Sequence, residues 1–114
     1  MLNSVTRPQK NVLFVCTANQ QRSPTAEEIY RNDRRFAVRS AGTHMLANRQ
    51  VTNELVRWAD LIVVMEEHHA RAIRDRFPDA IGDARLIVLG IPDIYQYMDR
   101  ALQREIRDRF EQQL

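Results

Sequence analysis

The chain has 114 residues, of which 44% are hydrophobic and 28% are charged, and its formal net charge at pH 7 is +2. This length fits one globular domain, and the composition excludes a disordered chain. No apolar run approaches the roughly 20 residues that cross a bilayer, so we expect no membrane partner. Residues 1–10 lack the apolar core of a secretory signal, which predicts a flexible segment at 1–10 and one domain at 11–114.

In chain order, the predicted elements are a strand at 11–16, a helix from 23 to about 34, a strand at 36–40, a helix at about 51–59, a strand at 60–65, a helix at 66–77, a strand at 84–90 and a helix at about 99–113. The strands are continuous apolar runs, whereas the helices carry apolar residues at a spacing of three or four. We expect Ser23 to cap the first helix, with Pro24 at its first helical position. Pro78 should end the third helix.

Strands that alternate with helices predict βαβ units and therefore a three-layer α/β/α fold, with a four-stranded, mostly parallel sheet. In such sheets, ligands bind beyond the carboxyl ends of the strands. Cys16, the loop after Ser40 and the loop around Asp93 all follow a predicted strand. We therefore expect these three segments to meet at one rim of the sheet.

Two features of the composition limit the partners. Cys16 is the only cysteine, which excludes an internal disulfide and favours a reducing, cytoplasmic compartment. Lys10 is the only lysine, and most arginines alternate with acidic residues, as in the C-terminal sequence DRALQREIRDRFEQQL. This alternation is typical of solvated helix faces. No aromatic residues are interleaved with the basic ones, so we expect no nucleic-acid partner.

The sequence CTANQQRS, from Cys16 to Ser23, joins the first strand to the first helix. A loop of this kind turns its backbone N–H groups and a helix N-terminus toward one point, where an anion can bind. Arg22 adds a guanidinium suited to two phosphate oxygens, and the same field stabilises a thiolate at Cys16. The Ser23 hydroxyl can donate to that sulfur or cap the helix. Cys16 alone would fit a buried, inert thiol. With Arg22 and Ser23 at this spacing, the loop favours covalent displacement on a phosphoryl group.

The sequence VLFVCTANQQRSPTAEE at 12–28 resembles the signature loop of the low-molecular-weight protein tyrosine phosphatase family. VRSAGT at 38–43 is similar to the second motif of that family, and ADLIVVMEEHH at 59–69 is similar to its third strand and the following helix. The likeness runs from about residue 11 to 100 and is greatest to a short bacterial branch. It implies a phosphatase that acts on phosphotyrosine or other aryl phosphates through a phosphocysteine intermediate. No cofactor and no metal is implied, and the partner would be a phosphotyrosine-bearing protein or a small aryl phosphate.

The resemblance also implies roles for single residues. Cys16 would be the nucleophile, Arg22 would stabilise the transition state, and Asp93 would protonate the leaving group and then activate water. The residues that would bind the phosphate are Thr17, Ala18, Asn19, Gln20, Gln21, Arg22 and Ser23.

Further positions of the family pattern would support the loop or line the substrate slot. Asn19 would hold the loop in shape with help from Ser23 and Ser40, since asparagine tolerates the left-handed conformation that such a loop often needs. Tyr95 matches an aromatic position that lines the slot for the substrate.

Three alternatives remain open at this stage. Asp93 follows Pro92 and fits a turn-forming residue as well as an acid. The chain could reduce arsenate, although this would require an external thiol because no second cysteine is present. It could also bind phosphorylated partners without turnover. A metal site is not expected, because His68 and His69 are adjacent on a helix and should face different directions.

Overall fold

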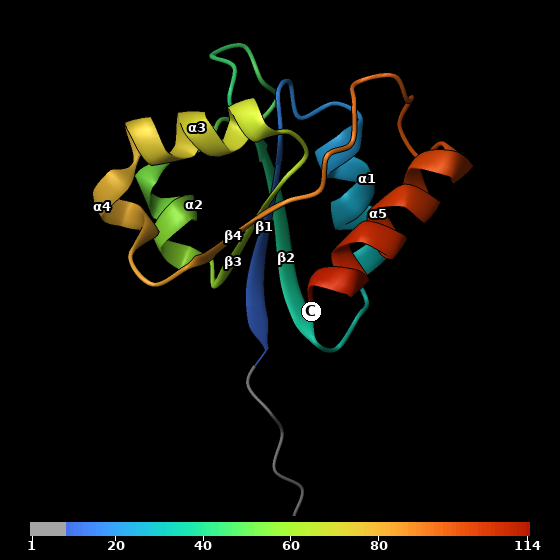
Figure 1. The fold of residues 1–114 in the computed structure, drawn as a ribbon, viewed down its shortest axis with the longest axis horizontal. Coiled ribbons are helices and arrows are strands. Elements are labelled where there is room, and N and C mark those ends of the chain that lie inside the picture. The colour runs from blue at the N-terminus through green and yellow to red at the C-terminus, as the bar shows by residue number, and fades with distance from the viewer. Residues whose placement is uncertain (1–8) are drawn as a thin grey trace, which may run out of the picture.

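The structure, a computed structural model, describes residues 9–114. It is built around one parallel sheet with the strand order β2-β1-β3-β4 (Figure 1). The strands are β1 (Lys10–Cys16), β2 (Phe36–Gly42), β3 (Leu61–Val64) and β4 (Arg85–Val88). Most of the segment expected to be flexible, residues 1–8, lies outside the described residues, whereas Lys10 already belongs to β1.

Helices cover both faces of the sheet (Figure 1). They are α1 (Arg22–Tyr30), α2 (Asn53–Trp58), α3 (Glu67–Arg76), α4 (Pro78–Ile81) and α5 (Arg100–Gln113). Helices α1 and α5 pack on one face, and α2, α3 and α4 pack on the other. The predicted three-layer α/β/α architecture is therefore confirmed. Among residues 9–114, no helix combines the length and the apolar character that crossing a bilayer requires.

The sequence of strand β1 is continuously apolar because both faces of the strand are buried. Val12 and Phe14 point toward α1 and α5, in a core that includes Phe110. Leu13 and Val15 point the other way, toward α2 and α3. Cys16 continues the first of these two rows, so that its side chain lies on the α1 side of the sheet at the carboxyl end of the strand.

The predicted start of the first helix is wrong, whereas the predicted end of the third is confirmed. Helix α1 begins at Arg22, with Gln21 as its N-cap, so Ser23 does not cap it and Pro24 occupies its third position. The Ser23 hydroxyl instead forms hydrogen bonds with Cys16, Asn19 and the carbonyl of Ala41. Pro78 follows α3 as expected, yet it also starts α4 at a position where proline is well tolerated.

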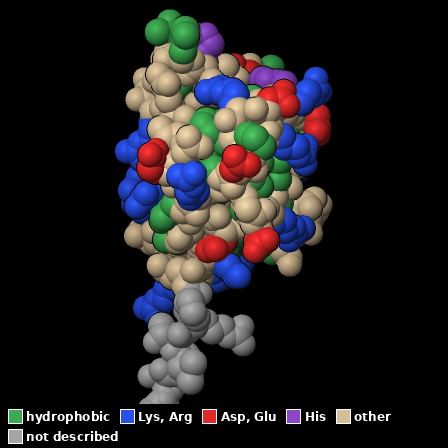
Figure 2. Space-filling model, turned by 90° about the vertical axis from the view of Figure 1, so that its left-hand side faces the viewer, with side chains coloured by type: hydrophobic (Ala, Val, Ile, Leu, Met, Phe, Trp, Pro, Cys, Tyr) green, Lys and Arg blue, Asp and Glu red, His purple; other side chains and the backbone are tan. Residues whose placement is uncertain are grey.

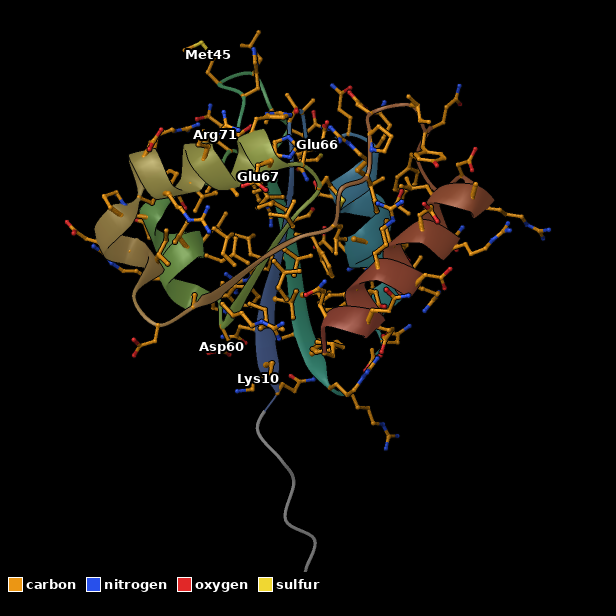
Figure 3. The ribbon with its side chains drawn as sticks, in the orientation of Figure 1. Lys10, Met45, Asp60, Glu66, Glu67 and Arg71 are labelled. Carbon is orange, nitrogen blue, oxygen red and sulfur yellow. The ribbon has the colours of Figure 1, made fainter. Side chains whose placement is uncertain are left out.

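Figure 2 views the molecule from the side of α3 and α4 and shows basic and acidic side chains interspersed over this face. At its upper edge, hydrophobic and histidine side chains project beyond the body of the protein. This projection is the loop of residues 43–50, in which Met45 and Leu46 are largely exposed. The loop stands beyond the carboxyl ends of the strands, next to the segment that follows Cys16 (Figure 3).

Candidate active site

We call the segment between β1 and α1 the phosphate loop (residues 17–21). The carbonyl groups at its start accept hydrogen bonds from the loop of residues 43–50. The N–H of Thr43 donates to the carbonyl of Cys16 at 3.0 Å, and the N–H of His44 donates to that of Thr17 at 3.0 Å. Asn48 donates to the carbonyl of Ala18 at 3.1 Å. Within residues 9–114, by contrast, no backbone N–H from 17 to 22 donates a hydrogen bond. The loop therefore offers a series of free N–H donors, which is the arrangement that binds anions.

Asn19 shapes this loop. Its φ is 55°, in the left-handed region that asparagine tolerates better than most residues. Its side-chain amide is buried and donates to the hydroxyls of Ser23 at 3.0 Å and Ser40 at 2.9 Å. Ser40 in turn donates to Glu27 at 2.6 Å. The structure thus brings together the three residues expected to support the loop, although they come from three different segments.

Gly42 allows the 43–50 loop to approach the phosphate loop closely. A Cβ at this position would lie 2.4 Å from the carbonyl oxygen of Thr17 and 2.7 Å from Cβ of Ala47. Both distances are shorter than any side chain allows. A residue without a side chain is therefore required where β2 ends.

The Cys16 thiol is almost fully buried, with 3% of the residue exposed, and its Sγ lies 3.0 Å from Oγ of Ser23. Because Asn19 donates to Ser23 Oγ, the hydroxyl proton of Ser23 is left to donate elsewhere. Its acceptors within reach are Sγ of Cys16 and, at 3.3 Å, the carbonyl oxygen of Ala41. Of the two positions predicted for the Ser23 hydroxyl, the structure places it against the sulfur and not at the helix cap.

Arg22 is buried at the first position of α1, with 2% of its side chain exposed. Its Nη1 donates to Glu66 at 2.5 Å and to the carbonyl oxygen of Ile91 at 2.8 Å. Burial acts to raise the pKa of Glu66, but the hydrogen bond and the charge of Arg22 outweigh burial and hold this pKa below its usual value. Glu66 precedes α3 at the carboxyl end of β3, facing the α1 side (Figure 3). Hydrogen-bond acceptors on two other segments therefore hold the guanidinium in place.

Asp93 lies on the segment between β4 and α5 and reaches the same guanidinium, since its Oδ1 is 3.7 Å from Nε of Arg22. Its side chain is 61% exposed, so it stands at the mouth of the site. The ends of this segment are anchored: Arg109 donates to the carbonyl of Gly90 at 2.7 Å, and the N–H of Met98 donates to the Thr25 hydroxyl at 2.9 Å. The three loops expected at one rim therefore meet there.

The tyrosines of this segment are placed differently from each other. Tyr95 is half-buried and packs against the core on the side of α1 and α5, so that its predicted role in lining the substrate slot stays a prediction. Tyr97 is 51% exposed. It borders an open groove of about 440 Å³ beside the phosphate loop. The other residues along this groove are Asn19, Gln20, Pro24, Glu27, Ser40, Asn48 and Arg49.

His69 is a buried polar residue next to the phosphate loop to which the sequence analysis gave no role. Its ring is fully buried, and its Nε2 lies 2.8 Å from the Thr17 hydroxyl. Its Nδ1 accepts the backbone N–H of Glu66 at 3.0 Å. Contrary to our expectation, the rings of His68 and His69 do not face apart, since their centroids are 4.0 Å from each other. Potential ligand atoms of Glu66, His68 and His69 lie within 4.8 Å of one another. However, the lone pair on Nδ1 of His69 already accepts the Glu66 N–H and is not free to bind a metal.

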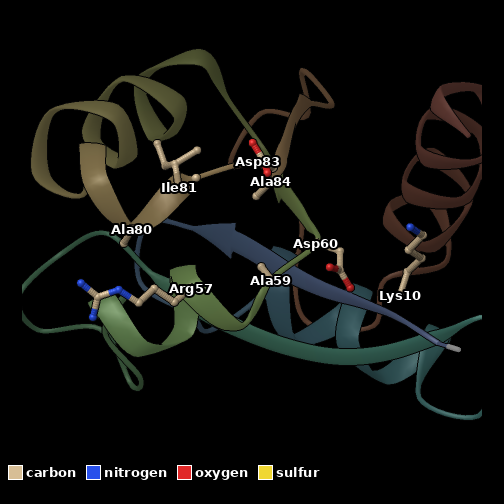
Figure 4. A pocket seen from close by; sticks show the side chains of 9 residues that line it. Lys10, Arg57, Ala59, Asp60, Ala80, Ile81, Asp83 and Ala84 are labelled. Carbon is tan, nitrogen blue, oxygen red and sulfur yellow. The ribbon is translucent and has the colours of Figure 1, made fainter.

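A second hollow, of about 340 Å³, lies at the opposite end of the sheet (Figure 4). Lys10 and Asp60 border it near the amino ends of β1 and β3, far from Cys16 at the carboxyl end (Figures 3 and 4). Asp60 is already used there, because it accepts the N–H of Asn11 at 2.8 Å. None of the residues that line this hollow is a cysteine, serine, threonine or histidine.

Comparison with known proteins agrees with the resemblance predicted from the sequence. Residues 11–49 match the profile of the family "Low molecular weight phosphotyrosine protein phosphatase". The match includes β1, the phosphate loop, α1 and β2, but it ends well before Asp93. A comparison with curated protein sequences finds no match.

Solved structures share the fold across nearly the whole chain. The tyrosine phosphatase Wzb from Escherichia coli K30 is 23% identical, with a TM-score of 0.71 over 93% of this chain and 96% of that one. SP-PTP from Streptococcus pyogenes, a low molecular weight protein tyrosine phosphatase, is 16% identical, with a TM-score of 0.74 over 93% and 94%. The YwlE arginine phosphatase from Geobacillus stearothermophilus is 24% identical, with a TM-score of 0.68 over 91% and 92%. The family match and the shared fold together indicate a hydrolase of the phosphatase type.

Proposed function

We propose that this chain hydrolyses phosphotyrosine or another aryl phosphate through a phosphocysteine intermediate on Cys16. The observation that carries this proposal is the position of the Cys16 sulfur at the start of a loop with free backbone N–H groups, which ends at the buried Arg22. A nucleophile inside an anion site is placed to attack the phosphorus of a bound phosphoryl group. Neither a metal nor a cofactor has a part in this mechanism.

In the first step, the Cys16 thiolate attacks phosphorus while the bond between phosphorus and the phenolic oxygen breaks. The loop N–H groups and Arg22 bind the oxygens on which negative charge is spread. Asp93 gives its proton to the leaving oxygen, so that a phenol departs rather than a phenolate. Its exposed position at the mouth of the site, on the side of Arg22, suits this role.

In the second step, the ionised Asp93 takes a proton from water, and the water oxygen attacks phosphorus. The bond between sulfur and phosphorus breaks, inorganic phosphate leaves, and Cys16 returns to a thiolate. Ser23 stabilises this leaving thiolate through its hydroxyl, 3.0 Å from the sulfur. Since such a thiolate must stay reduced to work, we place the enzyme in the cytoplasm.

The test is hydrolysis of p-nitrophenyl phosphate without added metal, measured from about pH 4 to 8 in wild type and variants. Cys16→Ser should abolish turnover, and Asp93→Asn should lower kcat by about 10²- to 10⁴-fold and remove the alkaline limb of the pH profile. Asp83→Asn makes the same chemical change at an exposed position near the far hollow and should leave the profile unchanged. Phosphate binding without any turnover in reduced wild type would refute the enzyme and leave a phosphate-binding module.

A second substrate class is phosphoarginine. Two observations favour it: a neighbouring structure is an arginine phosphatase, and the carboxylate of Asp93 stands at the mouth of the site with 61% of its side chain exposed. A cationic guanidinium next to the scissile bond would be attracted by this charge. Matched peptides that carry phosphotyrosine or phosphoarginine, compared by kcat/KM, decide between the two substrates.

A further inference from the structure

His69 is placed to control the phosphate loop, although it lies 52 residues away in the sequence. It occupies the third position of α3, and no part of the residue is exposed. Thr17, its partner, directly follows the nucleophile and begins the loop. The contact therefore ties the start of the loop to a helix that packs on the opposite face of the sheet from α1.

The hydrogen bonds of His69 fix which nitrogen carries its proton. A backbone N–H can only donate, so the Glu66 N–H 3.0 Å away makes Nδ1 an acceptor. In the neutral ring the proton is then on Nε2, which donates to the Thr17 hydroxyl at 2.8 Å. Both ring nitrogens are satisfied, and the ring cannot turn over without losing both bonds.

The ring also stays uncharged. Burial lowers the pKa of His69 to about 3, and the nearby charges of His68 and Arg22 act in the same direction, whereas Glu66 acts against them. A neutral ring keeps Nδ1 able to accept, so the arrangement persists in acidic solution, where the proposed reaction needs a protonated Asp93.

We infer that His69 is a positioning residue for the phosphate loop: its bond to Thr17 fixes the first peptide of the loop so that the loop N–H groups face the bound phosphate. This inference rests on the proposed function, because it assigns the loop the task of binding a phosphoryl group. The carbonyl side of the same peptide is held independently, since the Thr17 oxygen accepts the N–H of His44 at 3.0 Å. With the side chain and the carbonyl both fixed, Thr17 has little freedom to rotate.

The experiment measures binding of inorganic phosphate by calorimetry, which requires no turnover. Thr17→Val keeps the shape of the side chain but removes the acceptor of His69, and we expect about tenfold weaker binding, the effect of about one hydrogen bond. Thr17→Ser retains the hydroxyl and should bind phosphate within about twofold of wild type. As a matched control, Thr52→Val removes a side-chain hydrogen bond at the start of α2, away from the loop, and should bind as wild type does.

A double-variant cycle separates positioning from packing. His69→Leu and Thr17→Val break the same hydrogen bond. The phosphate affinity of the double variant should therefore be no lower than that of the single variant with the lower affinity. If His69→Leu fails to fold, Thr17→Val and Thr17→Ser still decide. Wild-type affinity in Thr17→Val, or equal loss in Thr17→Val and Thr17→Ser, would overturn the inference. Wild type that binds phosphate without hydrolysing p-nitrophenyl phosphate would instead refute the proposed function, and the affinities would still test His69.

Discussion

His69 should make the fold sensitive to acid in a way that a single substitution removes. In the unfolded chain, its ring takes up a proton as the pH falls below about 6.5, whereas the folded ring takes one up only near about 3. Between these values the unfolded state binds more protons, so the free energy of unfolding decreases as the pH falls. The loss begins near pH 6.5 and is complete near pH 3.

The size of the effect follows from the two pKa values. Between pH 7 and pH 4.5, linkage gives a loss of about 2.5 kcal/mol from His69. The exposed ring of His68 lies with its centroid 4.0 Å from that of His69, and screening by the solvent around it reduces the value to about 2 kcal/mol. Glu66 acts in the same direction, because its low pKa also stabilises the fold less as the pH falls. For this reason, His69 has to be isolated by substitution.

Urea unfolding of wild type and His69→Gln at pH 7 and about pH 4.5, followed by circular dichroism, measures the difference. Glutamine can offer a donor and an acceptor at this position but does not titrate. We expect the variant to lose about 2 kcal/mol less than wild type on acidification, even if it is less stable at pH 7. His68→Gln removes a charge that itself helps to lower the pKa of His69, so this variant should lose less than wild type but more than His69→Gln. Equal losses in wild type and His69→Gln would refute the reasoning.

Three further substitutions test the packing and the charges that support the site. Gly42→Ala places a Cβ 2.4 Å from the Thr17 carbonyl oxygen, so urea unfolding should show a loss of about 1–3 kcal/mol, and phosphate affinity should also fall. Glu66→Gln removes the charge that fixes Arg22 but keeps the shape, so we expect kcat/KM for p-nitrophenyl phosphate to fall about tenfold, and unchanged kinetics would contradict this role. Phe110→Ala empties a position where two aromatic rings lie within 5.4 Å, and thermal unfolding should reveal a loss of about 3–5 kcal/mol with phosphate affinity retained.

The sequence predicted the features that depend on neighbouring residues. The apolar run that ends at Cys16 and the helix that follows it are both encoded locally, and so is the loop between them. The left-handed conformation of Asn19 could also be expected, because it reflects the chemistry of one side chain. The helix boundary at Ser23 could not, since its hydroxyl is engaged by Cys16 and Asn19, which precede the helix, rather than by the helix terminus.

The hydrogen bonds that hold Arg22 and Thr17 in place were not predictable from a single sequence, because their partners lie far away along the chain. Arg22 meets Glu66 across 44 residues and the carbonyl of Ile91 across 69. His69 resembles any polar residue of an amphipathic helix until the fold places it against Thr17. A charged or polar residue at the start of a helix normally faces water. Only the arrangement of the strands shows that these positions face the interior.

The residues that hold the phosphate loop in place come later in the sequence than the loop itself, which matters while the protein is synthesised on the ribosome. The loop carbonyls are bound by residues 43–48, and the guanidinium is held by groups at Glu66 and Ile91. A nascent chain that ends before Ile91 therefore carries the nucleophile without the partners that hold its anion site together. Because proteins emerge from the ribosome N-terminus first, Cys16 emerges before the residues that hold its phosphate site in place. The phosphate site can therefore form only after Ile91 has emerged.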